Sequence, residues 1–456
     1  MRTLTKTEQQ ARFEGLSYQD ILDRDSRTPP DSLRAQCAPY LGSEPVPAAH
    51  YTSRARFDLE VDKMWLHVWQ MACREEEIPA VGDYMTYEIA GRSLLVVRSA
   101  PDRIQAFHNT CLHRGRKLAV GPGCSFELRC PFHGFAWHLD GSFKSNPFPW
   151  DFQHLEAGDL TLPEVRVGLW GGFVFINFDP QAPELVNIIA PLEQHFRRWR
   201  PEERYISFHV AKVIRCNWKV ASEAFMESHH TLETHPQLMV HLADVNSQYD
   251  VFSDYVTRQI SANGVASPHL GDVREQEIAD ALTARRADGA KALTIPEGGK
   301  ARAALAERVR QSMSAADGHD YTQFSDAEML DSILYNVFPN FSVWGGVAKT
   351  RVYRWRPNGD DVHSSIMEVY GLAPVAKGRS RPQPAPLRVL SDAERWSDAA
   401  ELGGLGFILD QDMGNLPYVQ EGLVSSGNNK VHFANYQEMR IRQHHVMIQR
   451  YIDTQR

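Results

Sequence analysis

The chain has 456 residues, of which 43% are hydrophobic and 23% charged, so it can form a substantial core in two or three domains. Its net charge of −8 argues against nucleic acid as a partner, because phosphate binding requires a basic surface. We find no apolar run long enough to span a membrane and no secretory signal, and six cysteines are too few for a disulfide framework. We therefore expect a cytoplasmic protein that does not act at a membrane.

The chain changes its pattern twice in its first half. Residues 1–55 are polar and broken by prolines, with one helix expected near the start. From residue 56 to 180, short alternating runs such as GDYMTYEIAG, RSLLVVRS and GGFVFINFD predict a small all-β domain. After Pro180 the spacing becomes helical, and LVNIIAPLEQHFRRW and CNWKVASEAFMESHH each predict a helix.

The second half contains the least informative stretch, residues 240–335. It is rich in Ala, Arg and Asp and has one helical pattern, ARAALAERVRQSM, and we interpret it as a variable insertion or a lid. The segments FSVWGGV, KTRVYRWRP and SSIMEVYGL that follow predict strands of an antiparallel sheet. A helix is expected between Asp410 and Gln420, and a terminal helix after Phe433.

Two cysteines and two histidines in the β segment form the strongest motif. Cys111 and His113 form C-x-H, and Cys130 and His133 form C-x-x-H after a gap of sixteen residues. Zinc fingers usually place two Cys in one half and two His in the other, whereas here each half supplies one of each. A [2Fe–2S] cluster with two His on one iron requires this composition. A zinc ribbon, or core cysteines beside unrelated histidines, is the alternative.

The segment around these residues, CLHRG and CPFHGFAWHLDG, resembles the cluster-binding signature of Rieske ring-hydroxylating oxygenase α-subunits. The flanking segments WLHVWQMACREEEIPAVGDY and LWGGFVFINFDP are also similar to that family. The resemblance implies an α+β fold, with a small all-β Rieske domain inserted in a larger helix-grip-like catalytic domain, an antiparallel sheet flanked by helices. It implies three parts: an N-terminal segment, 1–55, that packs with the catalytic domain; a Rieske domain, 56–180; and a catalytic domain, 181–456.

An oxygenase also needs an iron with open positions, commonly held by two His and one carboxylate. Glu227 and His230 are three residues apart and would share one face of a helix, and His235 follows five residues later. The resemblance implies that His230 and His235 bind this iron and that Glu227 connects it to the Rieske histidine of a neighbouring subunit. Glu223 is either a supporting residue behind the site or part of a solvated helix face.

The third iron ligand must come from another part of the chain. Gln411-Asp412, followed by Gln420, resembles a late element of the family, which implies Asp412 as the carboxylate ligand. Asp410 is the alternative, and an Asp that caps a helix is the interpretation without metal.

The resemblance implies the terminal component of an O₂-dependent oxygenase that takes electrons, ultimately from NAD(P)H, through a reductase or ferredoxin. We expect mono- or dihydroxylation of a hydrophobic, aromatic or polycyclic substrate. Glu227 stands where many relatives have Asp and resembles members that act on quaternary ammonium compounds, so N-dealkylation or C–N cleavage of a quaternary or tertiary amine is the alternative. A non-catalytic Rieske electron carrier would explain the cluster but not the second set of residues.

The resemblance also implies a head-to-tail homotrimer, in which His113 or His133 faces the neighbour's Glu227, and a separate β subunit is possible. Several apolar residues are candidates for the substrate pocket, namely Phe225, Met226, Leu238, Met239, Phe338, Phe341, Val343 and Trp344.

Overall fold

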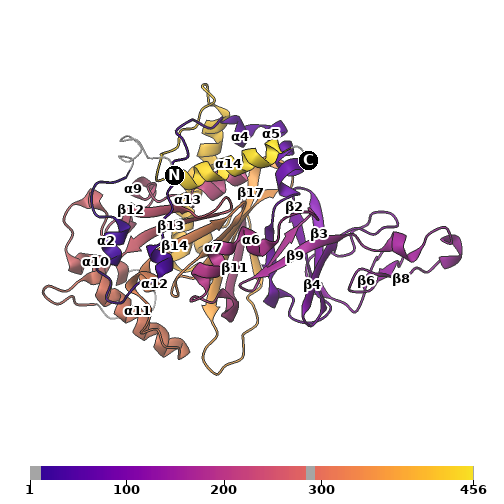
Figure 1. Cartoon of the computed structure of the whole chain (residues 1–456), viewed down its shortest axis with the longest axis horizontal. Coiled ribbons are helices and arrows are strands. Elements are labelled where there is room, and N and C mark those ends of the chain that lie inside the picture. Colours follow the sequence, from indigo (N-terminus) through magenta and orange to yellow (C-terminus); the bar gives the residue numbers. More distant parts are fainter. Residues whose placement is uncertain (1–11, 284–292, 455–456) are drawn as a thin grey trace.

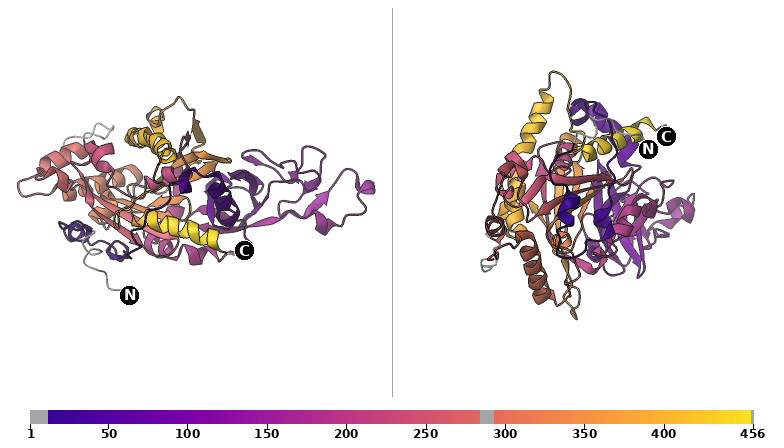
Figure 2. Two further views of the ribbon diagram at one scale, coloured as in Figure 1. Left: turned by 90° about the horizontal axis from the view of Figure 1, so that it is seen from above. Right: turned by 60° about the vertical axis from the view of Figure 1, so that its left-hand side comes forward.

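The computed structural model describes residues 12–283 and 293–454. The molecule is elongated, with a larger body of helices around a sheet and a narrower β-rich part that projects from it (Figure 1). Seen from above, the far end of this projection, which contains β6 and β8, lies well away from the body (Figure 2).

The projecting part contains a sheet of seven antiparallel strands within the described residues, in the order β1-β10-β9-β4-β3-β2-β5. A second, three-stranded sheet at its far end has the order β6-β7-β8. The strands are β1 (Gln70–Arg74), β2 (Asp83–Ile89), β3 (Arg92–Ala100), β4 (Arg103–His108), β5 (Gly123–Cys124), β6 (Leu128–Arg129), β7 (Ala136–Trp137), β8 (Phe143–Ser145), β9 (Glu164–Trp170) and β10 (Phe173–Asn177).

The body is built on an eight-stranded sheet in the order β12-β13-β14-β15-β16-β17-β11-β18, counted over the described ranges. All neighbours are antiparallel except β18, which runs parallel to β11. The strands are β11 (Arg204–Ile214), β12 (Leu242–Val251), β13 (Val256–Asn263), β14 (Ser332–Val337), β15 (Phe341–Trp344), β16 (Arg351–Asn358), β17 (Asp361–Pro374) and β18 (Leu387–Leu390). The predicted α+β class is confirmed, and so are the three strands expected after residue 335.

Helices pack around this sheet, and the predicted helices near 410–420 and after Phe433 are α13 and α14. In the part of the chain that the structure describes, no helix is both long and apolar enough to cross a membrane. The helices are α2 (Tyr18–Leu22), α3 (Asp31–Arg34), α4 (Ala49–Thr52), α5 (Arg54–Glu60), α6 (Leu185–Ile188), α7 (Ala190–Phe196), α8 (Trp218–Glu223), α9 (Thr231–Thr234), α10 (Glu275–Thr283), α11 (Ala301–Asp317), α12 (Asp326–Leu330), α13 (Gly404–Val424) and α14 (Met439–Asp453).

The prediction of one continuous helix through CNWKVASEAFMESHH is wrong. α8 ends at Glu223, and turns lead to the separate short helix α9. Glu227 therefore does not share a helix face with His230. Its carboxylate instead accepts a hydrogen bond from the backbone N–H of His230 at 3.1 Å, so the side chain competes with a helical hydrogen bond.

The interpretation of residues 240–335 as a variable insertion or a lid is wrong for their first portion. Their first portion forms β12 and β13, two strands of the central sheet, and is not an insertion. β12 is buried although it is rich in polar residues, because these side chains find partners: Gln248 donates to the Ala35 carbonyl and Asp250 accepts from Arg258. Such a strand lacks the hydrophobic alternation that sequence interpretation relies on. The expected helix in ARAALAERVRQSM is present as α11.

A buried polar cluster lies behind α8 and joins it to the N- and C-terminal helices. Lys219 forms a buried ion pair with Glu60 at 2.7 Å. Glu223 accepts a hydrogen bond from the Tyr51 hydroxyl at 2.8 Å, and its other oxygen lies 2.9 Å from Nε2 of His445. Burial raises the pKa of Glu223 to about 8 and lowers that of His445 to about 3, so both are neutral near pH 7. Glu223 thus supports the packing behind the site and is not part of a solvated face.

This protonation state predicts how stability depends on pH. The folded chain keeps the Glu223 proton up to about pH 8, whereas the unfolded chain releases it near pH 4.5, the ordinary value. The folded state thus binds more protons between these values, and the contribution of Glu223 to the free energy of unfolding falls as pH rises from about 4.5 to 8. Glu223→Gln removes this titration. The free energies of unfolding of wild type and variant are measured by denaturant unfolding at pH 5.5, 7 and 8.5. As the pH rises, the wild type should lose stability relative to the variant. A difference that does not change with pH would contradict this assignment.

Candidate metal centres

Two loops at the far end of the projecting domain present the four residues of the Cys/His motif. In the first loop the Gly115 N–H donates to the Cys111 carbonyl, and the Cys111 N–H donates to the Arg116 carbonyl. The second loop repeats this pattern, with Gly134 N–H to Cys130 carbonyl and Cys130 N–H to Phe135 carbonyl. Both glycines have a positive φ, 76° and 78°, which closes each turn at little steric cost.

The side chains on these loops converge. The rings of His113 and His133 are 4.7 Å apart, and Cys111 and Cys130 are buried and interact with each other. Among the described residues none of the six cysteines forms a disulfide. Nδ1 of His113 is buried without a hydrogen-bond partner, which is costly unless another group satisfies it. Two thiols beside two imidazoles fit a cluster with mixed Cys and His ligation better than a zinc site with separate Cys and His halves.

A second set of potential ligands lies in the body of the molecule. One ligand atom from each of His230, His235 and Asp412 lies within 4.8 Å of the others. Nε2 of His235 is 2.8 Å and Nε2 of His230 is 3.7 Å from the same Asp412 oxygen. Two imidazoles and a carboxylate on one side of a cavity are a donor set that suits a mononuclear non-haem iron with open positions.

The other nitrogen of each histidine is fixed by a neighbouring side chain. Nδ1 of His230 lies 2.5 Å from a Glu227 oxygen, and Nδ1 of His235 donates to the Gln411 amide oxygen at 3.0 Å. Since each Nδ1 is occupied, Nε2 of both rings is left free to face Asp412. Gln411 was not predicted to have this role, although its position next to Asp412 was visible in the sequence.

The charges of Glu227 and His230 stabilise each other. Burial disfavours the charged form of both, but their hydrogen bond and mutual attraction lower the pKa of Glu227 and raise that of His230. His229 adds a second contact, with its Nδ1 3.3 Å from the other Glu227 oxygen. Glu227 therefore stays ionised beside the potential iron ligands.

Asp412 and the alternative ligand Asp410 have different surroundings. Asp412 lies on the inner side of α13 with 6% of its surface exposed. The Asp410 carboxylate instead accepts backbone N–H bonds from Trp396 at 2.7 Å and Ser397 at 3.1 Å. Asp410 thus serves to anchor α13 to the preceding loop.

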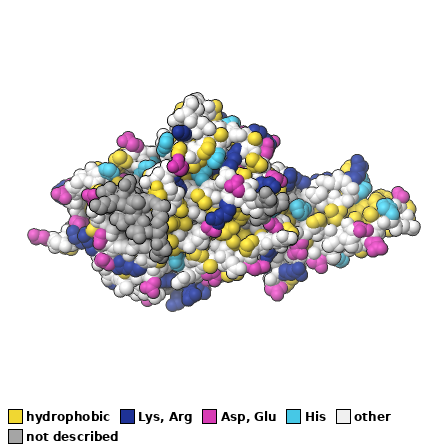
Figure 3. Space-filling view, turned by 45° about the horizontal axis from the view of Figure 1, so that its top comes forward, with side chains coloured by type: hydrophobic (Ala, Val, Ile, Leu, Met, Phe, Trp, Pro, Cys, Tyr) yellow, Lys and Arg dark blue, Asp and Glu magenta, His cyan; other side chains and the backbone are white. Residues whose placement is uncertain are grey.

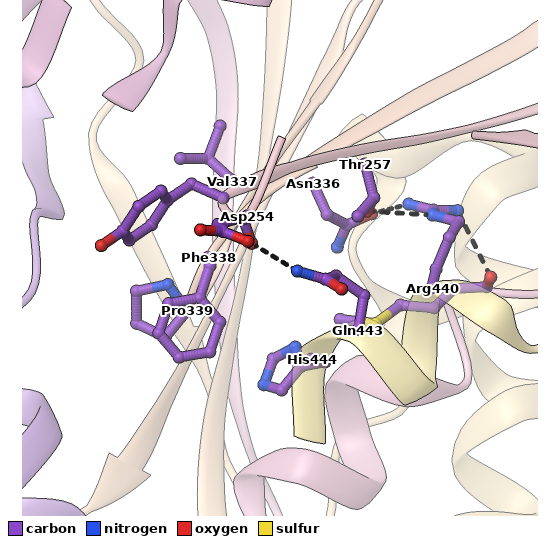
Figure 4. A pocket seen from close by; sticks show the side chains of 11 residues that line it. Asp254, Thr257, Asn336, Val337, Phe338, Pro339, Arg440, Gln443 and His444 are labelled. Carbon is purple, nitrogen blue, oxygen red and sulfur yellow. Dashed lines mark hydrogen bonds between the residues drawn. The ribbon is translucent and has the colours of Figure 1, made fainter. Parts of the chain in front are cut away.

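The terminal helix α14 holds the irregular segment before His230 in place. Figure 4 shows Arg440 reaching from α14 toward Asn336 and Thr257, beside a space of only about 10 Å³. Arg440 also donates to the Met226 carbonyl at 3.4 Å, next to Glu227. Gln443 donates to the Asp254 carbonyl at 3.1 Å in the same region (Figure 4). This space is too small for a substrate, and its residues position the chain behind the site.

A cavity of about 530 Å³ opens onto the three potential iron ligands. Of the eight predicted pocket residues, Phe225, Leu238 and Trp344 line this cavity, and the other five do not. Phe341 and Val343 alternate with Trp344 along β15 and point to the opposite face, where Phe341 packs against Phe173 with ring centroids 5.0 Å apart. Leucines of α10, α11 and α13 contribute much of the remaining wall.

Comparison with protein families agrees with this arrangement. Residues 194–454 match the model of the ring hydroxylating alpha subunit (catalytic domain), and residues 68–156 match the model of the Rieske [2Fe-2S] domain. The glycine betaine monooxygenase oxygenase subunit of Pseudomonas aeruginosa is 29% identical over 255 residues, which are 54% of this chain and 58% of the relative. The carnitine monooxygenase oxygenase subunit of Escherichia coli is 29% identical over 194 residues, 42% of this chain and 52% of the relative. The matches thus span little more than half the length of these curated relatives.

Solved structures share the fold at low sequence identity. The quaternary ammonium Rieske monooxygenase CntA, in complex with L-carnitine, superposes with a TM-score of 0.63 at 17% identity over 90% of this chain and 96% of CntA. Naphthalene 1,2-dioxygenase, in its F352V form bound to phenanthrene, gives 0.62 at 18% identity over 91% of this chain and 94% of the dioxygenase. With the catalytic family model covering more than half of its residues, the chain belongs to the ring-hydroxylating α-subunit family, whose cofactors are a Rieske [2Fe–2S] cluster and a mononuclear iron.

Proposed function

We propose that this chain is the terminal oxygenase component of a Rieske-type system. One observation carries the proposal: His230, His235 and Asp412 converge at a cavity of about 530 Å³ in a chain that also has a Rieske domain. In its monooxygenase form the reaction is RH + O₂ + 2 e⁻ + 2 H⁺ → ROH + H₂O. The electrons come from NAD(P)H through a reductase or ferredoxin. An electron carrier would need neither the cavity nor the second ligand set.

The residues divide into two metal sites. Cys111, Cys130, His113 and His133 would hold the cluster, which stores one electron at a time. His230, His235 and Asp412 would hold the mononuclear iron, which supplies O₂ activation when bound. The protein keeps the two Nε2 atoms directed at one point, holds the negative charge of Glu227 beside His230, and surrounds the substrate with apolar walls that exclude water.

An amine is the better supported substrate. The sequence relatives are named for glycine betaine and carnitine, and the structural neighbour CntA is a quaternary ammonium monooxygenase. Phe225 and Tyr353 line the cavity, and aromatic faces attract an alkylammonium group. We therefore favour oxidation of a quaternary or tertiary amine over the aromatic substrate expected from the sequence. Because leucines form much of the cavity wall, hydroxylation of a hydrophobic substrate is the second candidate function.

We further propose that two copies of the chain cooperate across an interface, as in a head-to-tail homotrimer. A surface hollow of about 500 Å³ is lined by Glu227, His230 and Asp412 together with the exposed residues Tyr418 and Val419 of α13. Near the cluster loops Phe132 and Trp150 are exposed, and Figure 3 shows hydrophobic side chains along the projecting part. The projecting end of one copy is suited to contact this hollow in another.

The ligand assignment predicts a selective loss of iron. His230→Ala and Asp412→Asn should each retain the cluster colour but hold about one iron fewer per chain, and substrate oxidation should be abolished, because one of three protein ligands is missing. Iron analysis with visible absorbance measures both quantities. The matched control is Asp410→Asn, which removes a nearby carboxylate that binds backbone N–H groups. Iron loss in the control, with retention in Asp412→Asn, would reverse the assignment.

If Glu227 connects the mononuclear iron to the Rieske histidine of a neighbouring subunit, its replacement should slow electron transfer without changing the iron content. Glu227→Gln still offers an oxygen to Nδ1 of His230 but removes the charge. We expect turnover about 10–100-fold lower, with cluster and iron retained. The rate at which O₂ reoxidises the reduced cluster in the presence of substrate gives the direct readout. Glu233→Gln on α9, an exposed carboxylate nearby, serves as the control. Wild-type reoxidation in Glu227→Gln would remove Glu227 from the electron path.

The substrate class can be decided with reduced, iron-loaded protein and two panels of compounds. One panel contains quaternary and tertiary amines, and the other contains aromatic and polycyclic hydrophobes. Mass spectrometry after addition of O₂ should detect dealkylated or cleaved amines from the first panel. Oxygenated rings from the second panel alone would favour the second candidate instead.

A further inference from the structure

Two cations line the substrate cavity without a carboxylate partner. Lys349 lies just before β16, and Arg351 is the first residue of that strand. Among residues 12–283 and 293–454 neither side chain forms an ion pair, and Lys349 has no side-chain hydrogen bond. Cations that are withdrawn from bulk water are rarely left unpaired. The proposed function does not account for this pair.

Within the described residues, no carboxylate lies within ion-pair distance of either side chain. The Arg351 guanidinium lies 5.2 Å from the centre of the Trp344 ring, a contact that orients the group and leaves its charge intact. Burial, with a smaller effect from Arg351 and against the attraction of Asp331, lowers the pKa of Lys349 to about 7, so roughly half of the side chains are protonated near pH 7. An ammonium group in this position gains from any anion that enters the cavity.

β16 carries both Arg351 and Tyr353, and Tyr353 lies near the Asp412 carboxylate. Tyr353 follows Arg351 by two residues, so both side chains lie on the same face of the strand, about 7 Å apart along it. Tyr353 is also close enough to Asp412 for that carboxylate to raise its pKa, in addition to the larger effect of burial. The cavity is therefore lined both by acidic residues, Glu227 and Asp412, and by the two cations.

We propose that Lys349 and Arg351 bind an anionic group of the substrate, a carboxylate in the simplest case, while another part of the substrate reaches the iron-binding residues. This inference rests on the proposed function and narrows its substrate class. An amine substrate would be a zwitterion with a carboxylate, and a hydrophobic substrate would be an acid.

The test measures binding without turnover, using anaerobic holoenzyme and isothermal titration calorimetry. The probes are two matched pairs: γ-butyrobetaine and its amide, and phenylacetate and phenylacetamide. In wild type at least one carboxylate should bind about 10-fold or more tightly than its amide, because an interaction with a charged donor is lost in the amide. Lys349→Met should remove most of this preference, and Lys349→Arg should restore it. Lys430→Met, at an exposed position, is the control.

Two results would overturn the inference: an unchanged carboxylate preference in Lys349→Met, or no binding of either carboxylate to wild type at millimolar concentration. Because binding is measured without O₂, failure of the proposed oxygenation would appear only in the product assay and can be told apart. Thermal unfolding adds a second readout. A lysine kept for a ligand should leave Lys349→Met as stable as wild type or more stable, whereas a structural lysine would lower the melting temperature.

Discussion

The convergence of His230, His235 and Asp412 depends on the hydrogen bonds at the Nδ1 atoms of the two histidines. An imidazole can present either nitrogen, and its ring can turn about two bonds, so two histidines on irregular backbone do not by themselves define a site. Glu227 and Gln411 occupy the Nδ1 atoms and leave both Nε2 atoms facing Asp412. The donor geometry is thus set by side chains that would not touch the metal.

These supporting residues are themselves held by contacts from distant parts of the chain. Gln237 donates to the same Gln411 oxygen that receives the His235 hydrogen bond. Arg440 on the terminal helix reaches the Met226 carbonyl, and Asp410 fixes α13 to the loop before it. Buried polar groups of this kind are stable only when each has a partner. The body of the molecule can be understood as a scaffold that satisfies them.

How much could be predicted from sequence depended on whether the information was local. The four residues of the Cys/His motif lie within one short stretch, and their spacing alone indicated two halves with one Cys and one His each, which the structure places on two matching loops. Asp412 is far along the chain from His235, and only family resemblance suggested it. Local patterns failed where a side chain replaced a backbone partner, as Glu227 does after α8, and where polar residues were buried in β12. The missing partners of Lys349 could not be inferred, since an absent contact leaves no trace in a sequence.

Helix α13 has one further physical consequence. It carries Asp412 on its buried side and Tyr418, 72% exposed, six residues later. At 1.5 Å per residue these positions are about 9 Å apart along one helix, with Pro417 between them. If Asp412 holds the proposed iron, a molecule that binds at Tyr418 and shifts α13 changes the affinity for iron, and by thermodynamic reciprocity iron changes the affinity for that molecule by the same factor. A partner whose binding strengthens iron binding would then loosen the metal when dilution separates the complex, even though no ligand residue had changed.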